Sequence, residues 1–133
     1  MFRIGQSTDV HQLTPGRDLI LGGVHIPYEK GCLGHSDADC LLHVICEAII
    51  GALGKGDLGT HFPDTDPKYK GVDSMVLLAA SYQMMIEDGY QIGNVDALMM
   101  IEKPKMAPHI PQMIQNVAKC LHCDPKMINI KAT

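Results

Sequence analysis

Residues 35–53, HSDADCLLHVICEAIIGAL, join a short polar segment directly to a long apolar run. The stretch from Asp37 to Leu53 is apolar on almost every face, which is typical of a buried helix. Ser36 or Asp37 can cap its first turn, and Gly54 is well placed to end it. The segment therefore predicts a central helix against which the rest of the chain packs.

Three polar residues of this helix, Asp39, His43 and Glu47, recur every four positions and so share one face. A solvated face on an otherwise packed helix explains such a stripe without any function. Alternatively, His43 binds a metal ion, and Asp39 or Glu47 accepts a hydrogen bond from its second ring nitrogen. The helix alone leaves both interpretations open.

Asp9-Val10-His11 near the N-terminus adds weight to the metal hypothesis. Alternate residues of a strand face the same side, so Asp9 and His11 can bind one ion together. Such a pair on an exposed strand is usually just solvated. With His43 it makes three protein ligands, the number that holds catalytic zinc and leaves one position open, whereas structural zinc has four. The pattern favours a metalloenzyme.

Strands and helices alternate along the rest of the chain. We expect strands over Phe2–Leu13, Val95–Ile101 and Met127–Lys131, a hairpin of Leu19–Leu21 and Val24–Ile26 turned by Gly22-Gly23, and helices over Asp73–Asp88 and Pro111–Leu121. This order predicts an α+β fold, an α/β sandwich with a single mixed β-sheet and helices packed on one face. At 133 residues the chain is expected to be one domain, residues 1–133.

Composition narrows the class of protein. A formal net charge of -4 and a pI near 5.9 argue against a nucleic-acid partner, which needs a basic face. No apolar run approaches the roughly 20 residues that span a bilayer, and no leader sequence is evident. We therefore expect a soluble, cytoplasmic protein.

The cysteines number five, an odd count that is best explained by buried, reduced thiols. Cys120-Leu121-His122-Cys123 resembles half of a zinc site, but a second ligand pair at suitable spacing is missing. Local packing is the preferred interpretation of that segment.

His35 comes just before the expected helix N-terminus, where unpaired N–H groups and the helix dipole favour anions. A phosphate there would receive donors from the backbone, His35 and Ser36. Simple helix capping explains the same residues, and the two roles are compatible.

Together these segments resemble the 2-C-methyl-D-erythritol 2,4-cyclodiphosphate synthase family of the non-mevalonate isoprenoid pathway. The resemblance covers almost the whole chain. It rests on the order and spacing of Asp9-Val10-His11, Gly22-Gly23-Val24, Ile26-Pro27-Tyr28, His35-Ser36-Asp37-Ala38-Asp39, Gly56-Asp57-Leu58-Gly59, Phe62-Pro63-Asp64-Thr65-Asp66-Pro67, Gly93-Asn94-Val95-Asp96, Pro104-Lys105-Met106 and Asn129-Ile130-Lys131-Ala132-Thr133.

The resemblance implies a lyase that cyclises 4-diphosphocytidyl-2-C-methyl-D-erythritol 2-phosphate and releases CMP. It implies that Asp9, His11 and His43 bind Zn²⁺, or another divalent transition metal, with a β-phosphate oxygen in the fourth position. A Mg²⁺ or Mn²⁺ ion bridges the diphosphate. Family members are homotrimers with active sites between subunits, so the metal and cytidine halves of a site are expected to come from different chains.

The resemblance also implies roles for individual residues. His35 matches the position that stabilises the transition state, and Ser36 the loop that contacts phosphate. Asp57 and Gly59 match residues that hold the methylerythritol hydroxyls. The remaining substrate contacts implied are Leu58, then Phe62, Pro63, Asp64, Thr65 and Asp66 in the following loop, and Ile101, Lys105, Met106, Ala107, Ala132 and Thr133 for cytidine.

Several positions depart from the family pattern. Gln6-Ser7-Thr8 replaces a glycine and an aromatic residue that lines the central cavity of the trimer, which weakens the case for isoprenoid-diphosphate binding there. Ile101 stands where a small residue is common, and Glu47 where Asp is frequent.

The largest departure is at Thr133. The family pattern continues beyond it with a second threonine, a metal-binding glutamate, an arginine loop and a closing strand, and a chain without them is expected to be less stable.

Two other classes of function use the same residues. A non-catalytic trimeric module would bind zinc and cytidine nucleotides but would catalyse no reaction. A zinc phosphohydrolase would release linear products by attack of water.

Overall fold

A computed structural model describes residues 1–133. Its helices are α1 (Cys40–Ala52), α2 (Leu58–His61), α3 (Ser74–Glu87) and α4 (Ile110–Cys120), with short 3₁₀ turns at Pro67–Tyr69, Ala107–His109 and Pro125–Met127. Its strands are β1 (Leu13–Pro15), β2 (Leu19–Leu21), β3 (Val24–Ile26), β4 (Lys30–Cys32), β5 (Val95–Met99) and β6 (Ile128–Ala132). The expected α+β class is confirmed. None of the helices combines the length and apolar character that crossing a membrane requires.

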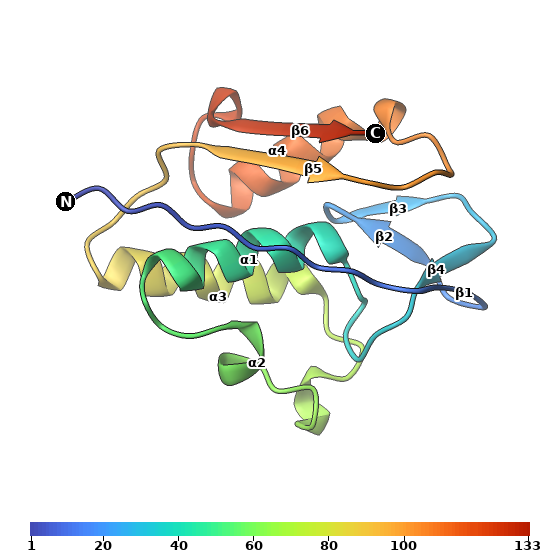
Figure 1. The fold of residues 1–133 in the computed structure, drawn as a ribbon, viewed down its shortest axis with the longest axis horizontal. Coiled ribbons are helices and arrows are strands. Elements are labelled where there is room, and N and C mark those ends of the chain that lie inside the picture. The colour runs from blue at the N-terminus through green and yellow to red at the C-terminus, as the bar shows by residue number, and fades with distance from the viewer.

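The strands form three two-stranded sheets, so the prediction of a single mixed sheet is wrong. β1 pairs with β4 and β2 with β3 in antiparallel register, while β5 pairs with β6 in parallel. Figure 1 shows α1 and α3 side by side beneath the β5–β6 pair, with the N-terminal segment running along α1. Fully buried side chains from α1, α3 and α4, among them Leu42, Leu78 and Met113, form the core between these layers.

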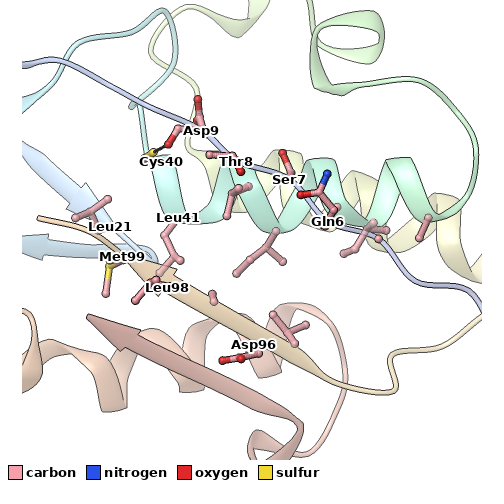
Figure 2. Close-up of a pocket in the computed structure, with 18 of the residues that line it drawn as sticks. Gln6, Ser7, Thr8, Asp9, Leu21, Cys40, Leu41, Asp96, Leu98 and Met99 are labelled. Atoms are coloured by element: carbon pink, nitrogen blue, oxygen red, sulfur yellow. Dashed lines mark hydrogen bonds between the residues drawn. The ribbon is translucent and has the colours of Figure 1, made fainter. Parts of the chain in front are cut away.

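The N-terminal segment corrects a second expectation. Residues 2–12 run extended past α1 and β5 (Figure 1), but only Leu13–Pro15 belongs to a strand. Residues 1–11 make no backbone–backbone hydrogen bond, which a strand needs. A groove of about 870 Å³ instead lies between this segment, α1 and β5, and Figure 2 shows Thr8, Leu41 and Leu98 lining it from these three elements.

Helix α1 begins later than either expected cap allows. Its N-cap is Asp39, whose carboxylate accepts a hydrogen bond from the Leu42 amide at 3.0 Å. Ala38 has a φ of +58°, outside the right-handed helical region, so the helix cannot extend back to Ser36 or Asp37. The start of α1 is therefore set by the residue after this backbone reversal.

Asp39 also ties α1 to the β2–β3 hairpin. Its carboxylate accepts hydrogen bonds from the amides of Gly22 at 3.0 Å and Gly23 at 2.8 Å. Both glycines have positive φ, as the expected two-residue turn requires, and a Cβ on Gly22 would lie 2.6 Å from Met113 Cγ. Asp39 is fully buried, so it does not belong to a solvated stripe.

Burial raises the pKa of Asp39 to about 6, against the lowering effect of its three backbone hydrogen bonds. A pKa above the unfolded value of 3.8 means that ionisation costs the folded state free energy. The Asp39 contribution to stability is therefore complete below pH 3.8 and is lost as pH rises through about 6.

We expect the unfolding free energy of the native protein, relative to Asp39→Asn, to fall by about 2–3 kcal/mol between about pH 4 and about pH 7.5. Asn keeps the size of the side chain but does not titrate, so the difference isolates this one group. Urea unfolding of both proteins across that pH range measures it. A difference that stays flat or rises with pH would contradict the assigned direction.

The remaining predicted elements are confirmed within one or two residues at each end. Helix α3 is capped by Asp73 and ends before Gly89, whose φ is +84°. All five cysteines are unpaired, but only Cys32 and Cys46 are buried, whereas Cys40, Cys120 and Cys123 are half-buried, so the prediction of buried thiols holds for two of them. Burial raises the pKa of Cys40 to about 12 and that of Cys46 to about 11, which keeps both as thiols at neutral pH.

Candidate metal centre

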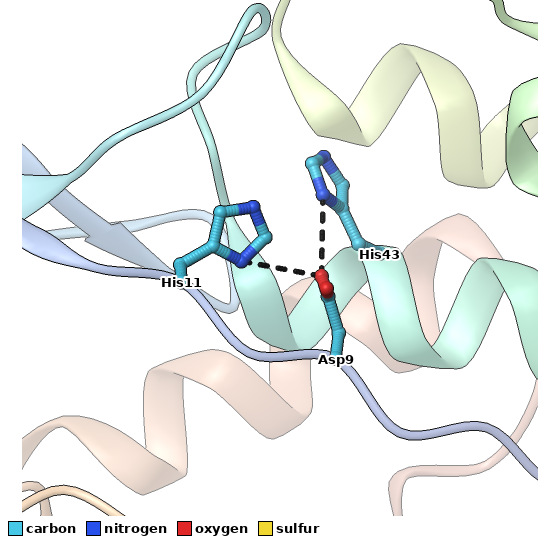
Figure 3. Close-up of side chains that lie close together, drawn as sticks. All are labelled: Asp9, His11 and His43. Atoms are coloured by element: carbon cyan, nitrogen blue, oxygen red, sulfur yellow. Dashed lines mark ion pairs between the residues drawn. The ribbon is translucent and has the colours of Figure 1, made fainter.

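Asp9, His11 and His43 lie together, as predicted. One ligand atom from each falls within 4.8 Å of the others. Asp9 Oδ2 lies 3.3 Å from His11 Nδ1 and 3.7 Å from His43 Nδ1. Figure 3 shows the carboxylate between the two rings, with Asp9 and His11 on the N-terminal segment and His43 on α1. The extended backbone at residues 9–11 places alternate side chains on one side even without a paired strand.

The electrostatics favour the protonation states that a metal needs. Burial alone would raise the pKa of Asp9, but the neighbouring His43 and His11 imidazoles outweigh it and lower that pKa. Burial lowers the pKa of His11, and it overrides the attraction of Asp9. An ionised carboxylate beside a neutral imidazole is the form that binds a divalent cation.

His11 Nδ1 is the observation that tests whether a metal fits. This atom is buried and has no hydrogen-bond partner, although Asp9 Oδ2 is close to it. A buried polar atom without a partner costs about 1–3 kcal/mol. One carboxylate oxygen and two imidazole nitrogens form a donor set suited to zinc and similar divalent transition metals. The residues therefore fit such an ion.

The second ring nitrogen of His43 does not contact the residues that the helical stripe predicted. His43 Nε2 lies 2.8 Å from Ser74 Oγ and 3.1 Å from Ser36 Oγ. Asp39 is engaged with the hairpin amides, and Glu47 lies one turn further along α1. Ser74 was not identified from the sequence, because a serine at the start of a helix carries no signal of a partner 31 residues away.

His35 and Ser36 lie in a loop held between two other segments. Arg17 donates hydrogen bonds to the carbonyls of Gly34 at 2.9 Å and Ser36 at 3.0 Å. His35 Nε2 lies 3.1 Å from the carbonyl oxygen of Asp66, which brings His35 to the loop formed by residues 62–66. Arg17 is a further residue that sequence reasoning missed.

A cavity of about 530 Å³ opens beside this loop, lined by Arg17, His35, Ser36 and Lys70 among others. Two cationic side chains, an imidazole and a hydroxyl offer donors for a phosphate group, although the carboxylates of Asp18 and Asp37 also line the cavity and oppose an anion. Because α1 begins only at Cys40, the helix dipole does not act directly at His35 as the sequence suggested. Side chains and loop amides would supply the donors instead.

The segment around Asp57 caps the short helix α2. The Asp57 carboxylate accepts hydrogen bonds from the Thr60 amide at 3.0 Å and the Thr60 hydroxyl at 2.7 Å, and these bonds lower its pKa. Leu58 and Gly59 form the first turn of α2. In the next loop Phe62 packs edge-on against Tyr69, while Asp64 and Thr65 are exposed.

Three of the residues predicted to surround cytidine, Ile101, Ala132 and Thr133, lie at the ends of β5 and β6. The Ile101 amide donates to the Thr133 carbonyl at 3.2 Å, which places these two residues side by side. Lys105 and Ala107 are exposed, whereas the Met106 side chain is buried in the core. The buried Met106 is therefore not available as a side-chain contact for a ligand.

The amino-acid sequence of this chain is similar to those of a known family of enzymes. The model of the YgbB family matches residues 2–133. A 2-C-methyl-D-erythritol 2,4-cyclodiphosphate synthase from Geotalea uraniireducens is 59% identical over 131 residues, covering 98% of this chain and 83% of that protein. The synthase from Halalkalibacterium halodurans is 56% identical over 133 residues, covering 100% of this chain and 85% of that protein.

Solved structures show the same similarity. A 2C-methyl-D-erythritol-2,4-cyclodiphosphate synthase in its CDP-bound form matches with a TM-score of 0.91 and 32% identity, covering 98% of this chain and 87% of that one. The bifunctional IspDF from Campylobacter jejuni matches with a TM-score of 0.94 and 40% identity, covering 98% of this chain and 36% of that one.

Proposed function

The chain belongs to the YgbB family, and we propose that it forms 2-C-methyl-D-erythritol 2,4-cyclodiphosphate, the product for which its relatives are named. The substrate is 4-diphosphocytidyl-2-C-methyl-D-erythritol 2-phosphate and the second product is CMP. The observation that carries this proposal is the cluster of Asp9, His11 and His43 in a chain so similar to these synthases over nearly its whole length.

The reaction is an intramolecular phosphoryl transfer. An oxygen of the 2-phosphate attacks the β-phosphorus, the bond from that phosphorus to the bridging oxygen breaks, and CMP leaves with the bridging oxygen. No water is consumed. In phosphoryl transfer a protein mainly positions groups and stabilises charge, so its side chains have no covalent step to perform.

Asp9, His11 and His43 are the residues proposed to hold Zn²⁺ or another divalent transition metal. When bound, such an ion supplies a Lewis acid and a template for the phosphate oxygens. A second divalent ion, Mg²⁺ or Mn²⁺, would neutralise charge on the diphosphate when bound. The chain contributes by presenting two ligands from the N-terminal segment and one from α1, which are brought together only in the folded state.

His35 and Ser36 are proposed to position and stabilise the phosphates. The cavity beside them contains Arg17 and Lys70, whose charges complement a phosphate. The contact of His35 with the Asp66 carbonyl orients the imidazole against the loop of residues 62–66. Donors held in place before the reaction stabilise developing charge without reorganisation.

The remaining contacts follow from the resemblance. The methylerythritol hydroxyls are assigned to Asp57 and Gly59, and further substrate contacts are assigned to Leu58 and the loop of residues 62–66. The nucleoside is assigned to Ile101, Lys105, Met106, Ala107, Ala132 and Thr133, contributed by a neighbouring subunit of a homotrimer in the cytoplasm. The Ile101 side chain, which is half-buried, is proposed to narrow that nucleoside pocket, because a small residue is common at this position in the family.

Product analysis tests the proposed function. The purified protein is incubated with the cytidine diphosphate substrate, zinc and magnesium, and the products are separated and identified by mass. We expect CMP and the cyclic diphosphate in equal amounts. CMP with a linear product would indicate a phosphohydrolase, and no turnover would indicate a binding module; either result would overturn the proposal.

A further inference from the structure

We propose that Asp37 and Ser74 are positioning residues that fix the ring orientation and the tautomer of His43. This inference deepens the proposed metal site and rests on it. The three residues come from separate segments: Asp37 from the loop before α1, His43 from α1, and Ser74 from the first turn of α3. Their side chains form a continuous hydrogen-bonded chain that ends at the metal centre.

The Asp37 carboxylate is held through both of its oxygens. Oδ1 accepts the hydroxyl proton of Ser74 in a short hydrogen bond and also accepts the Asp39 amide at 3.1 Å. Oδ2 accepts the Ser74 amide at 2.9 Å. The backbone of Asp37 is fixed as well, because its amide donates to the Val72 carbonyl at 3.0 Å. The carboxylate therefore has a single orientation toward Ser74.

The direction of the next hydrogen bond follows from counting protons. A serine hydroxyl has one proton to donate. Ser74 donates it in the hydrogen bond to the Asp37 carboxylate, which can only accept. Toward His43 Nε2, at 2.8 Å, the Ser74 oxygen can then only accept. Nε2 must therefore carry the proton. A neutral imidazole has one N–H, which leaves the lone pair on Nδ1, the nitrogen that faces Asp9.

Neither of the other neighbours of His43 imposes the opposite tautomer. Nδ1 lies 3.7 Å from Asp9 Oδ2, too far for a hydrogen bond from an Nδ1 proton. Ser36 Oγ is further from Nε2 than Ser74 Oγ, at 3.1 Å against 2.8 Å. It accepts the Ala38 amide with one lone pair, and its second lone pair can accept from Nε2 as well, so this contact is compatible with an Nε2 proton. Ser74 is fully buried, so water does not compete for its hydroxyl.

The first test measures the tautomer in the unmodified, metal-free protein. Correlation spectra of protein with ¹⁵N-labelled histidine, recorded near pH 8 where histidines are about fully neutral, show which ring nitrogen carries the proton. We expect the proton of His43 on Nε2. A proton on Nδ1 would overturn the proposal. The result depends on neither zinc nor turnover, so it is distinct from a failure of the proposed function.

The second test measures zinc affinity by competition with a chelating dye. Ser74→Ala removes the acceptor for the Nε2 proton, and loss of such a partner typically weakens metal binding by about 10–100-fold. Ser81→Ala is the matched control. Ser81 is equally buried on the same helix, but its hydroxyl donates to the Leu78 carbonyl at 2.8 Å, away from the site.

Ser81→Ala is expected to bind zinc as the native protein does. Equal affinity of Ser74→Ala and Ser81→Ala would overturn the positioning role. Asp37→Ala adds a readout that packing does not produce, because removal of the carboxylate that accepts the Ser74 hydroxyl proton leaves that proton free to point to His43 Nε2. We expect this variant to shift the His43 proton toward Nδ1, and an unchanged tautomer would contradict the proton count.

Discussion

Asp9→Ala and His43→Ala are each expected to reduce bound zinc from about one ion per chain to none, and to abolish cyclisation with it. Each change removes one of only three protein ligands. With two left, the site can no longer form the three-ligand set of a catalytic zinc centre. Elemental analysis after chelation, zinc loading and desalting measures the stoichiometry.

His25→Ala is the control for this pair of variants, because His25 is an exposed histidine on β3, away from the cluster. It should retain both zinc and activity. Undiminished zinc in Asp9→Ala and His43→Ala would show that these residues do not hold the metal.

His35→Ala is expected to lower kcat roughly tenfold to a thousandfold with little change in KM, the range for one lost donor to developing charge. His35 borders the proposed phosphate cavity, and its ring is oriented by the Asp66 carbonyl. Steady-state kinetics with the cytidine diphosphate substrate separate the two constants, with His25→Ala as the control. A raised KM at unchanged kcat would instead assign His35 to ground-state binding.

The metal cluster could be predicted because each of its parts leaves a local pattern. Alternation along an extended segment places Asp9 and His11 on the same side. His43 is recognisable because it is a polar residue in a strongly apolar helix. The partners of His43 leave no such pattern. Ser74 is 31 residues from His43, and Asp37 reaches Ser74 across 37 residues, so only the packing of α1 against α3 reveals the chain of hydrogen bonds.

The start of α1 shows why capping signals are ambiguous. Ser36, Asp37 and Asp39 are all good N-cap residues within four positions. Asp39 is the N-cap because its carboxylate also accepts hydrogen bonds from the hairpin amides of Gly22 and Gly23, and because Ala38 reverses the backbone. The first cause is a tertiary contact and the second is a backbone conformation, and the capping residues alone indicate neither.

The error at Phe2–Leu13 has a similar origin. The composition of a segment indicates that it is extended, but a strand also requires a partner for its backbone groups. In the structure residues 1–11 have no backbone partner, and the apolar groove beside them separates the segment from β5. A pattern in one segment cannot specify which neighbour it pairs with.

The proposed reaction is an intramolecular transfer at the centre formed by Asp9, His11 and His43. Running the reaction in ¹⁸O-labelled water and analysing both products by mass spectrometry tests it most directly. We expect a cyclic diphosphate and CMP that contain no solvent oxygen. A linear product carrying ¹⁸O on the former β-phosphate would show attack by water and would contradict the account.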